Sequence, residues 1–270
     1  MEILWEDSVE DSWKGGITLG YTVALGGKGG TGKTTIAGLL IRYMIQHGMK
    51  PVLAIDADSN ANLNEVLGVP LSITLSDARE SMKRDVPTGM TKDIYMEMKM
   101  EEALVESQGF DLVAMGLPEG PGCYCAANNL LTGLIEKLMK NYDYLVIDNE
   151  AGMEHFSRLT QKDVDLLLLV SDPSRRGLTT ACRIAQLVKG LPIRVGETFL
   201  IVNQVQETPA SWPQDVLDVF GRDRIAAFPA DKLLARFDQE GKPSVHLPGD
   251  APIVEAAETL FGKLLGEGAR

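Results

Sequence analysis

The 270-residue sequence has few cysteines, histidines and aromatic residues. It contains three cysteines and three histidines, and aromatic side chains make up 6% of the chain. A small and odd number of cysteines excludes a framework of disulfide bonds and favours a reducing compartment. No apolar run approaches the ~20 residues of a membrane-spanning helix, and residues 1–16 are acidic where an export signal would be basic. We therefore expect a cytoplasmic protein.

Positive charge is also scarce. The chain has 26 lysines and arginines against 38 aspartates and glutamates, which gives a formal net charge of -12. Such a surface repels nucleic acid and anionic lipid, so we expect neither as a partner. The hydrophobic fraction of 44% is ordinary for a globular protein and predicts a substantial core.

Short apolar runs alternate with amphipathic stretches along the chain. The runs that predict strands are residues 21–25, 51–55, 110–115, 142–147, 165–170, 198–202 and 224–228. Most of them are apolar at every position, which is typical of parallel strands that are covered on both faces. Between them, residues 35–48 and 129–141 carry apolar side chains at helical spacing. The alternation predicts an α/β fold with a doubly wound, mostly parallel sheet that binds its ligand at the carboxyl ends of the strands.

The acidic N-terminal extension, residues 1–16, stands apart from the rest. It holds two of the three tryptophans, and the sequence leaves open a disordered arm, an extra edge strand or a partner contact. No linker or repeat divides residues 17–270, which we expect to form a single domain.

A methionine-rich stretch at residues 94–107 has apolar residues that alternate with polar ones from Ile94 to Met100. This period of two predicts a half-buried strand. Methionine is common as core filler, so packing is favoured over a metal site here.

A glycine-rich stretch, GGKGGTGKTT, occupies residues 26–35. From Gly27 to Thr34 it matches the pattern G-x-x-x-x-G-K-[ST] between a predicted strand and a predicted helix, the context that a phosphate-binding loop requires. In such a loop backbone N–H groups face the β-phosphate, Lys33 reaches the β- and γ-phosphate oxygens, and Thr34 binds Mg²⁺. The predicted nucleotide-binding residues are Gly27, Gly29, Gly30, Thr31, Gly32, Lys33, Thr34 and Thr35.

Polar residues end three other predicted strands. Asp56 and Asp58 follow the second strand, and Asp148 ends the fourth, where it is similar to a Walker B aspartate in the outer shell of Mg²⁺. Carboxyl ends of parallel strands meet at one edge of a sheet, so we expect these aspartates beside the phosphate-binding loop. Asn203 ends a late strand without the Asn-Lys-x-Asp pattern of guanine-binding proteins, which favours ATP over GTP.

With a second lysine, Lys28, the phosphate-binding loop resembles the deviant loop of the nitrogenase iron protein, the MinD and ParA ATPases and several metallochaperones. The resemblance implies an ATP-promoted homodimer in which Lys28 reaches the partner's nucleotide and acts like an arginine finger. It also implies that Asp58 positions the attacking water, that Asp56 supports the Mg²⁺ shell, and that Asn203 contacts adenine. The predicted catalytic residues are therefore Lys28, Lys33 and Asp58, and the predicted magnesium residues are Thr34, Asp56 and Asp148.

Two of the three cysteines, Cys123 and Cys125, lie in EGPGCYCAANN at residues 119–129, before a predicted helix. A helix N-terminus lowers the pKa of a thiol and favours the thiolate that binds metal. Two thiolates cannot enclose a metal, but the two-fold axis of a dimer would supply four, which suit Zn²⁺, Ni²⁺ or an Fe–S cluster. The alternative is two small residues packed in a turn. Cys182 lies among aliphatic residues of a helix-like stretch, and we expect it to be buried.

The stretch GPGCYCAANNLL, together with DNEAGMEH at residues 148–155, resembles the CooC-type accessory ATPases of carbon monoxide dehydrogenase and their relatives that serve acetyl-CoA synthase. The likeness extends to residues 228–243. It implies a cytoplasmic ATPase that dimerises with ATP, binds Ni²⁺ between paired cysteines and assists nickel insertion into one of these enzymes. Gly152 would allow a switch that senses the γ-phosphate, and His155 fits a hydrogen-bonding role better than a metal-binding one.

Two other functions remain open at this point. An iron-protein-like ATPase would carry an Fe–S cluster, but its cysteines are far apart in the chain, and Cys182 supplies no obvious second position. A positioning ATPase of the MinD or ParA kind would need a membrane helix or a basic surface, and the C-terminal stretch EAAETLFGKLLGEGAR has no basic face.

Overall fold

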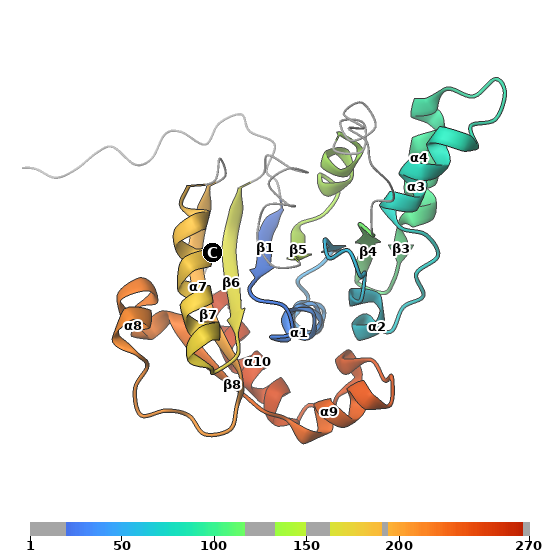
Figure 1. Cartoon of the computed structure of the whole chain (residues 1–270). Helices are drawn as coiled ribbons and strands as arrows, with labels where there is room; N and C mark the ends of the chain where they lie inside the picture. Colours follow the sequence, from blue (N-terminus) through green and yellow to red (C-terminus); the bar gives the residue numbers. More distant parts are fainter. Residues whose placement is uncertain (1–19, 117–132, 150–162, 191–193, 267–270) are drawn as a thin grey trace, which may run out of the picture.

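The computed structural model describes residues 20–116, 133–149, 163–190 and 194–266. Eight strands in these ranges form one sheet with the order β3-β4-β2-β5-β1-β6-β7-β8, and helices lie on both sides of it (Figure 1). Each neighbouring pair is parallel except β3 and β4, which are antiparallel. The predicted α/β fold with a doubly wound, mostly parallel sheet is therefore confirmed.

The seven apolar runs that predicted strands all form strands. The strands are β1 (Tyr21–Gly26), β2 (Val52–Asp56), β3 (Val105–Glu106), β4 (Phe110–Ala114), β5 (Tyr144–Asp148), β6 (Val164–Ser171), β7 (Val195–Val205) and β8 (Ile225–Pro229). The helices in the described ranges include α1 (Lys33–Gln46), α2 (Leu63–Leu67), α3 (Leu75–Arg84), α4 (Lys92–Ala103), α7 (Arg175–Val188), α8 (Gln214–Phe220), α9 (Lys232–Gln239) and α10 (Pro252–Leu265), with short 3₁₀ turns at Arg222–Arg224 and Ser244–His246. Residues 133–139 are also helical. None of the helices in the described ranges is both long and apolar enough to cross a membrane.

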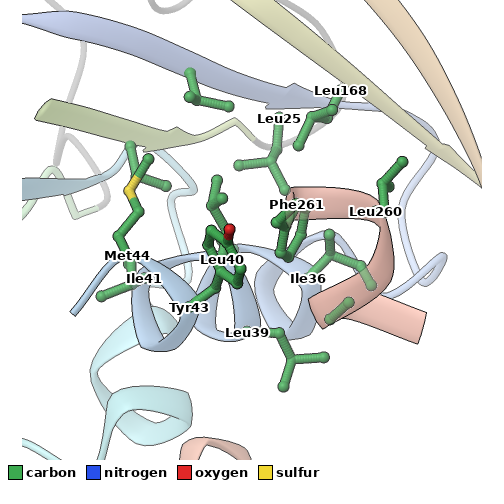
Figure 2. Packing of buried hydrophobic residues seen from close by; sticks show 14 of the residues in the cluster. Leu25, Ile36, Leu39, Leu40, Ile41, Tyr43, Met44, Leu168, Leu260 and Phe261 are labelled. Atoms are coloured by element: carbon green, nitrogen blue, oxygen red, sulfur yellow. The ribbon is translucent and has the colours of Figure 1, made fainter. Parts of the chain in front are cut away.

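One face of the sheet packs against α1 and α10 (Figure 2). Leu25 of β1 and Leu168 of β6 point into this core, and they meet Ile36 and Leu40 of α1 and Phe261 of α10. All five side chains are fully buried, and each stabilises the fold by roughly 1.5–3 kcal/mol relative to exposure. This packing holds α1 against the sheet next to β1. The position of the loop that joins β1 to α1 is therefore fixed as well.

The opposite face packs against α7, α8 and residues 133–139. Ala24 and Leu167 are buried on this side, whereas the next residues, Leu25 and Leu168, are buried on the other. Because successive side chains of a strand point to opposite faces, a strand covered on both sides must be apolar throughout. The continuous apolar runs of the sequence have this origin.

The methionine-rich stretch is not a strand. Residues Lys92–Ala103 form α4, and the only strand in this stretch is the two-residue β3. The hydroxyl of Thr91 accepts a hydrogen bond from Ile94 N at 3.4 Å and caps the helix, which then contains Met, Glu, Lys and Ala, all good helix formers. Met96 and Met100 are buried, but Ile94 and Met98 are 56% and 42% exposed. The alternation was therefore a coincidence of composition, and the spacing of four between the buried methionines is the helical one.

Candidate nucleotide site

The phosphate-binding loop joins the end of β1 to the start of α1. Gly27 has a φ of 143°, and a Cβ atom there would lie 2.1 Å from Val170 O of the neighbouring strand. Gly32 has a φ of 89°, and its Cβ would lie 2.4 Å from Asn203 Nδ2. Both distances are far shorter than a non-bonded contact of a Cβ atom, and both φ values are ones that L side chains rarely adopt. Glycine is therefore the residue that fits these two positions.

The two lysines of the loop differ in their surroundings. Lys33 is 6% exposed, and its Nζ donates a hydrogen bond to Lys28 O at 3.3 Å, while Thr31 Oγ1 donates to the same oxygen at 2.9 Å. These bonds hold the loop curled over the N-terminus of α1, where free backbone N–H groups favour an anion. The side chain of Lys28, by contrast, is exposed.

Asp56 and Asp148 end the adjacent strands β2 and β5 and lie opposite each other in the register. Both residues are 1% exposed. Burial raises the pKa of Asp56 to about 6 and the pKa of Asp148 to about 7, and each carboxylate lies close enough to other aspartates for repulsion to add to the rise. Thr34 and Lys33 lower the pKa of Asp148, which places them on the same side of the site.

The carboxylate of Asp56 organises the loop that follows β2. Its two oxygens accept hydrogen bonds from Asp58 N at 3.1 Å and from Leu63 N at 2.8 Å. Asp58 in turn accepts from Asn60 N at 2.9 Å, the bond of an Asx turn, so its position is set by the backbone around it. Neither oxygen of Asp148 makes a hydrogen bond of normal geometry within the described part of the chain, although the Thr34 hydroxyl is close enough to lower the pKa of Asp148. A cation held beside Thr34 would satisfy them, and carboxylate and hydroxyl oxygens are the ligands that Mg²⁺ prefers.

A cavity of about 800 Å³ opens from the phosphate-binding loop towards the ends of β7 and β8. Of the residues predicted for the site, Gly29, Gly30, Gly32, Lys33, Thr34, Thr35, Asp58 and Asn203 line it. Gly27, Thr31, Asp56 and Asp148, which are also predicted for the site, are not among its lining residues. Asn203 is 3% exposed, and its Nδ2 donates to Thr31 O at 2.9 Å, so it ties β7 to the loop. Its Oδ1 has no hydrogen-bond partner among the described residues.

The residues of the far wall of this cavity were not predicted from the sequence. Gln204, which has a φ of 60°, and Asp231, which follows β8, both line it. Asp231 accepts hydrogen bonds from Leu233 N at 2.7 Å and Ile253 N at 3.2 Å, so one carboxylate fixes the starts of α9 and α10. An aspartate just after a predicted strand was a usable signal, the same one that revealed Asp56.

Five residues singled out from the sequence lie outside the described residues or outside the site. Cys123, Cys125, Gly152 and His155 belong to the first group. Cys182 is a free cysteine on α7 and is 7% exposed, as expected, and burial raises the pKa of its thiol. The described ranges contain no cluster of three or more His, Cys, Asp or Glu side chains able to hold a metal ion.

Comparison with known families decides the class of this site. Residues 22–245 match the family model described as the CobQ/CobB/MinD/ParA nucleotide binding domain. The chain belongs to this family. It is therefore a P-loop ATPase of the CobQ/CobB/MinD/ParA type.

Individual relatives of this ATPase cover most of its length. An uncharacterised ATP-binding protein of Methanocaldococcus jannaschii is 37% identical over 250 residues, which are 91% of this chain and 98% of the relative. The carbon monoxide dehydrogenase accessory protein CooC of Rhodospirillum rubrum is 34% identical over 237 residues, 81% of this chain and 87% of CooC. Among solved structures, MinD of Pyrococcus horikoshii in complex with Mg-ADP superposes with a TM-score of 0.66 over 92% of this chain and 96% of MinD, at 22% identity. That last likeness shows the fold alone.

The raised pKa of Asp148 predicts how the stability of the nucleotide-free ATPase depends on pH. Between the unfolded pKa of 3.8 and the folded value of about 7, the folded chain binds more protons than the unfolded chain, so its free energy of unfolding falls as the pH rises. We expect Asp148→Asn to raise that free energy by roughly 1–3 kcal/mol at pH 8 and to leave it nearly unchanged at pH 4. Thermal unfolding of both proteins at the two pH values, without nucleotide or metal, measures this. An equal effect of the substitution at both pH values would show that buried charge is not its cause.

Proposed function

We propose that this ATPase is an accessory protein for a nickel enzyme, which hydrolyses ATP as a homodimer and assists nickel insertion into carbon monoxide dehydrogenase or acetyl-CoA synthase. The 34% identity to the accessory protein CooC over 81% of the chain supports the acceptor class. Nickel is the substrate of this activity, and Cys123 and Cys125 are its proposed ligands, two from each chain. Zn²⁺ would compete at the same thiolates.

The identity to CooC is the observation that carries the proposal, and the topology of the sheet supports a link between the nucleotide and the cysteine segment. The chain that leads to Cys123 and Cys125 leaves β4, and the chain that leads to Gly152 and His155 leaves β5, on either side of β2. At this edge Met115 N donates to Asp56 O at 2.8 Å, and Ala57 N donates to Asp148 O at 2.9 Å. The chain is thus hydrogen-bonded, where it leaves β4 and where it leaves β5, to the end of β2, beside Asp56 and Asp58. We propose that a change at the γ-phosphate is passed through these bonds towards the segment that carries the cysteines.

The residues of one chain account for nucleotide binding and for placing the water. The N–H groups of the loop and Lys33 bind the β- and γ-phosphates, with Asn203 on the base side. Thr34 and Asp148 would hold Mg²⁺, with Asp56 supporting its shell, and the ion would neutralise charge on the phosphates. Asp58, fixed by its bond to Asp56, orients the attacking water. Lys28 is exposed, so it is free to extend to the nucleotide of a second chain, where its charge would complete the stabilisation.

Nickel binding by the reduced protein tests the ligand assignment. In anaerobic equilibrium dialysis we expect Cys123→Ser/Cys125→Ser to weaken nickel binding by at least about 100-fold, because the soft thiolates are replaced by hydroxyls. Cys182→Ala is the matched control, since it removes the buried cysteine on α7, and it should bind nickel like the unmodified chain. Retention of nickel by the double variant would overturn the assignment.

Activation of nickel-free acceptor enzymes then tests the function itself. Purified nickel-free carbon monoxide dehydrogenase and acetyl-CoA synthase are each incubated with the ATPase, nickel and ATP. One of the two should gain activity faster with the ATPase than without it, and the gain should be absent with the cysteine double variant. No gain with either acceptor would contradict the proposed function, even if nickel binds.

A further inference from the structure

A second pocket lies at the opposite edge of the sheet from the nucleotide. It is formed where the end of α7, the start of β7, the end of α8 and the start of β8 meet, and its volume is about 460 Å³, within the range of pockets that hold ligands. Its cations are Lys189, Arg194 and Arg224, and Val188, Val219 and Phe220 are among its apolar residues. We refer to it as the amino-edge pocket. All of its charged lining residues are positive, in a chain whose net charge is -12.

Two of these cations have no ion-pair partner among the described residues. Lys189 and Arg194 are exposed and take part in no salt bridge there, whereas Arg224 pairs with Glu197 at a distance of 3.4 Å. The main chain of Arg194 is held in place, because its N donates to Asp163 Oδ1 at 3.0 Å and its O accepts from Val164 N at 2.9 Å. The pocket thus presents the positive charges of Lys189 and Arg194, which have no ion-pair partner among the described residues, beside apolar surface. Such a combination fits an acidic segment with large apolar side chains.

The chain contains one such segment, and it joins the sheet close by. Residues 1–16 carry five acidic residues against one lysine, together with Trp5 and Trp13. The described chain begins at Gly20, just before β1, and Thr22 N donates to Asp165 Oδ2 of β6 at 2.7 Å. Val164 of β6 is in register with Val195 of β7, which lines the pocket. The entry into β1 is therefore about 10 Å, two strand spacings, from the pocket. Trp13 is eight residues before Tyr21, and a chain of that length extends up to about 25 Å.

We propose that residues 1–16 dock on the amino-edge pocket of their own chain, with acidic side chains facing Lys189 and Arg194 and a tryptophan against the apolar wall. The short connection favours the same chain over a second copy, because it keeps the segment at a high effective concentration near the pocket. The proposal depends neither on the nucleotide nor on the cysteines, so it can fail without affecting the proposed function.

Tryptophan fluorescence of the full-length chain tests the docking. The chain has three tryptophans, so Trp212→Phe leaves Trp5 and Trp13 as the only ones. In this background Lys189→Glu/Arg194→Glu should shift the emission to the red and raise the acrylamide quenching constant by roughly threefold, because the indoles move from an apolar surface into water. Acrylamide is neutral, so the altered charge does not itself change its access. In 1 M salt, where the Debye length is about 3 Å, the Trp212→Phe protein that keeps Lys189 and Arg194 should also show a red shift of the emission and a higher quenching constant.

Arg84→Glu/Lys92→Glu is the matched control, since it reverses two exposed charges on α3 and α4 and changes the net charge by the same amount. It should leave emission and quenching unchanged, and all variants should bind an ATP analogue, which shows that they are folded. If the quenching constant of the Trp212→Phe protein already equals that of the pocket variant, the proposal is wrong. Quenching that falls as the protein concentration rises would also overturn it, because the segment would then dock on a second copy.

Discussion

Replacing Lys28 by alanine is expected to lower the rate of ATP hydrolysis by at least about 10²-fold and to leave the binding of ATP to a single chain nearly unchanged. Lys28 is exposed, and among the described residues its contribution to the loop is the backbone oxygen that accepts hydrogen bonds from Thr31 and Lys33. The alanine variant keeps that backbone oxygen and loses the side-chain charge, which we do not expect a single chain to need for binding ATP. Hydrolysis assays and nucleotide titrations of the variant measure the two effects separately. Lys92→Ala, on the exposed side of α4, is the control for loss of a surface lysine.

Mixing two inactive variants shows in which chain Lys28 acts. In a dimer of one Lys28→Ala chain and one Asp58→Ala chain, the nucleotide of the first chain has its own Asp58 and receives Lys28 from the partner. Random pairing of equal amounts makes half of the dimers mixed, each with one complete site, so about a quarter of the unmodified activity should return. If Lys28 acts on the nucleotide of its own chain, each site lacks one residue and no activity returns.

Replacing Gly27 by alanine is expected to have the largest effect on stability of any single change in the phosphate-binding loop. The added Cβ would lie 2.1 Å from Val170 O, a backbone atom of a central strand that cannot move away, and the φ of 143° is strained for any other residue. We expect the nucleotide-free chain to lose about 2–4 kcal/mol of its free energy of unfolding, and ATP affinity to fall by at least about 100-fold as the loop is displaced.

Gly29→Ala is the matched control for this substitution. It lies two residues away in the same loop, its Cβ would meet no atom within 4 Å, and its φ is not in the left-handed region. The unfolding free energy of the nucleotide-free Gly29→Ala chain should change by less than about 0.5 kcal/mol. Chemical denaturation of both variants measures the difference. Equal losses would show that a general intolerance of the loop, and not the contact with β6, determines the cost at Gly27.

The strands and the glycine-rich loop between β1 and α1 were predictable because each depends on local chemistry. A strand buried on both faces must be apolar throughout, and a loop that curls around phosphate needs glycine where Gly27 meets β6. The far wall of the cavity was missed although Asp231 lies shortly after a predicted strand, and only its hydrogen bond from the distant Ile253 N is beyond any local pattern. The error at residues 94–100 has a different cause: period two and period 3.6 both fit a short run of Met, Glu and Lys, and only the cap at Thr91 separates them.

The link between nucleotide state and metal is the central claim, and native mass spectrometry of the reduced protein with nickel tests it most directly. With a non-hydrolysable ATP analogue the account predicts a dimer that carries one nickel ion, and with ADP it predicts chains that have lost both the partner and the nickel. The same spectrum reports the mass of the assembly and its metal content, so the two changes can be seen to coincide. A chain that remains monomeric with the analogue, or a nickel content that is the same in both nucleotide states, would contradict the account.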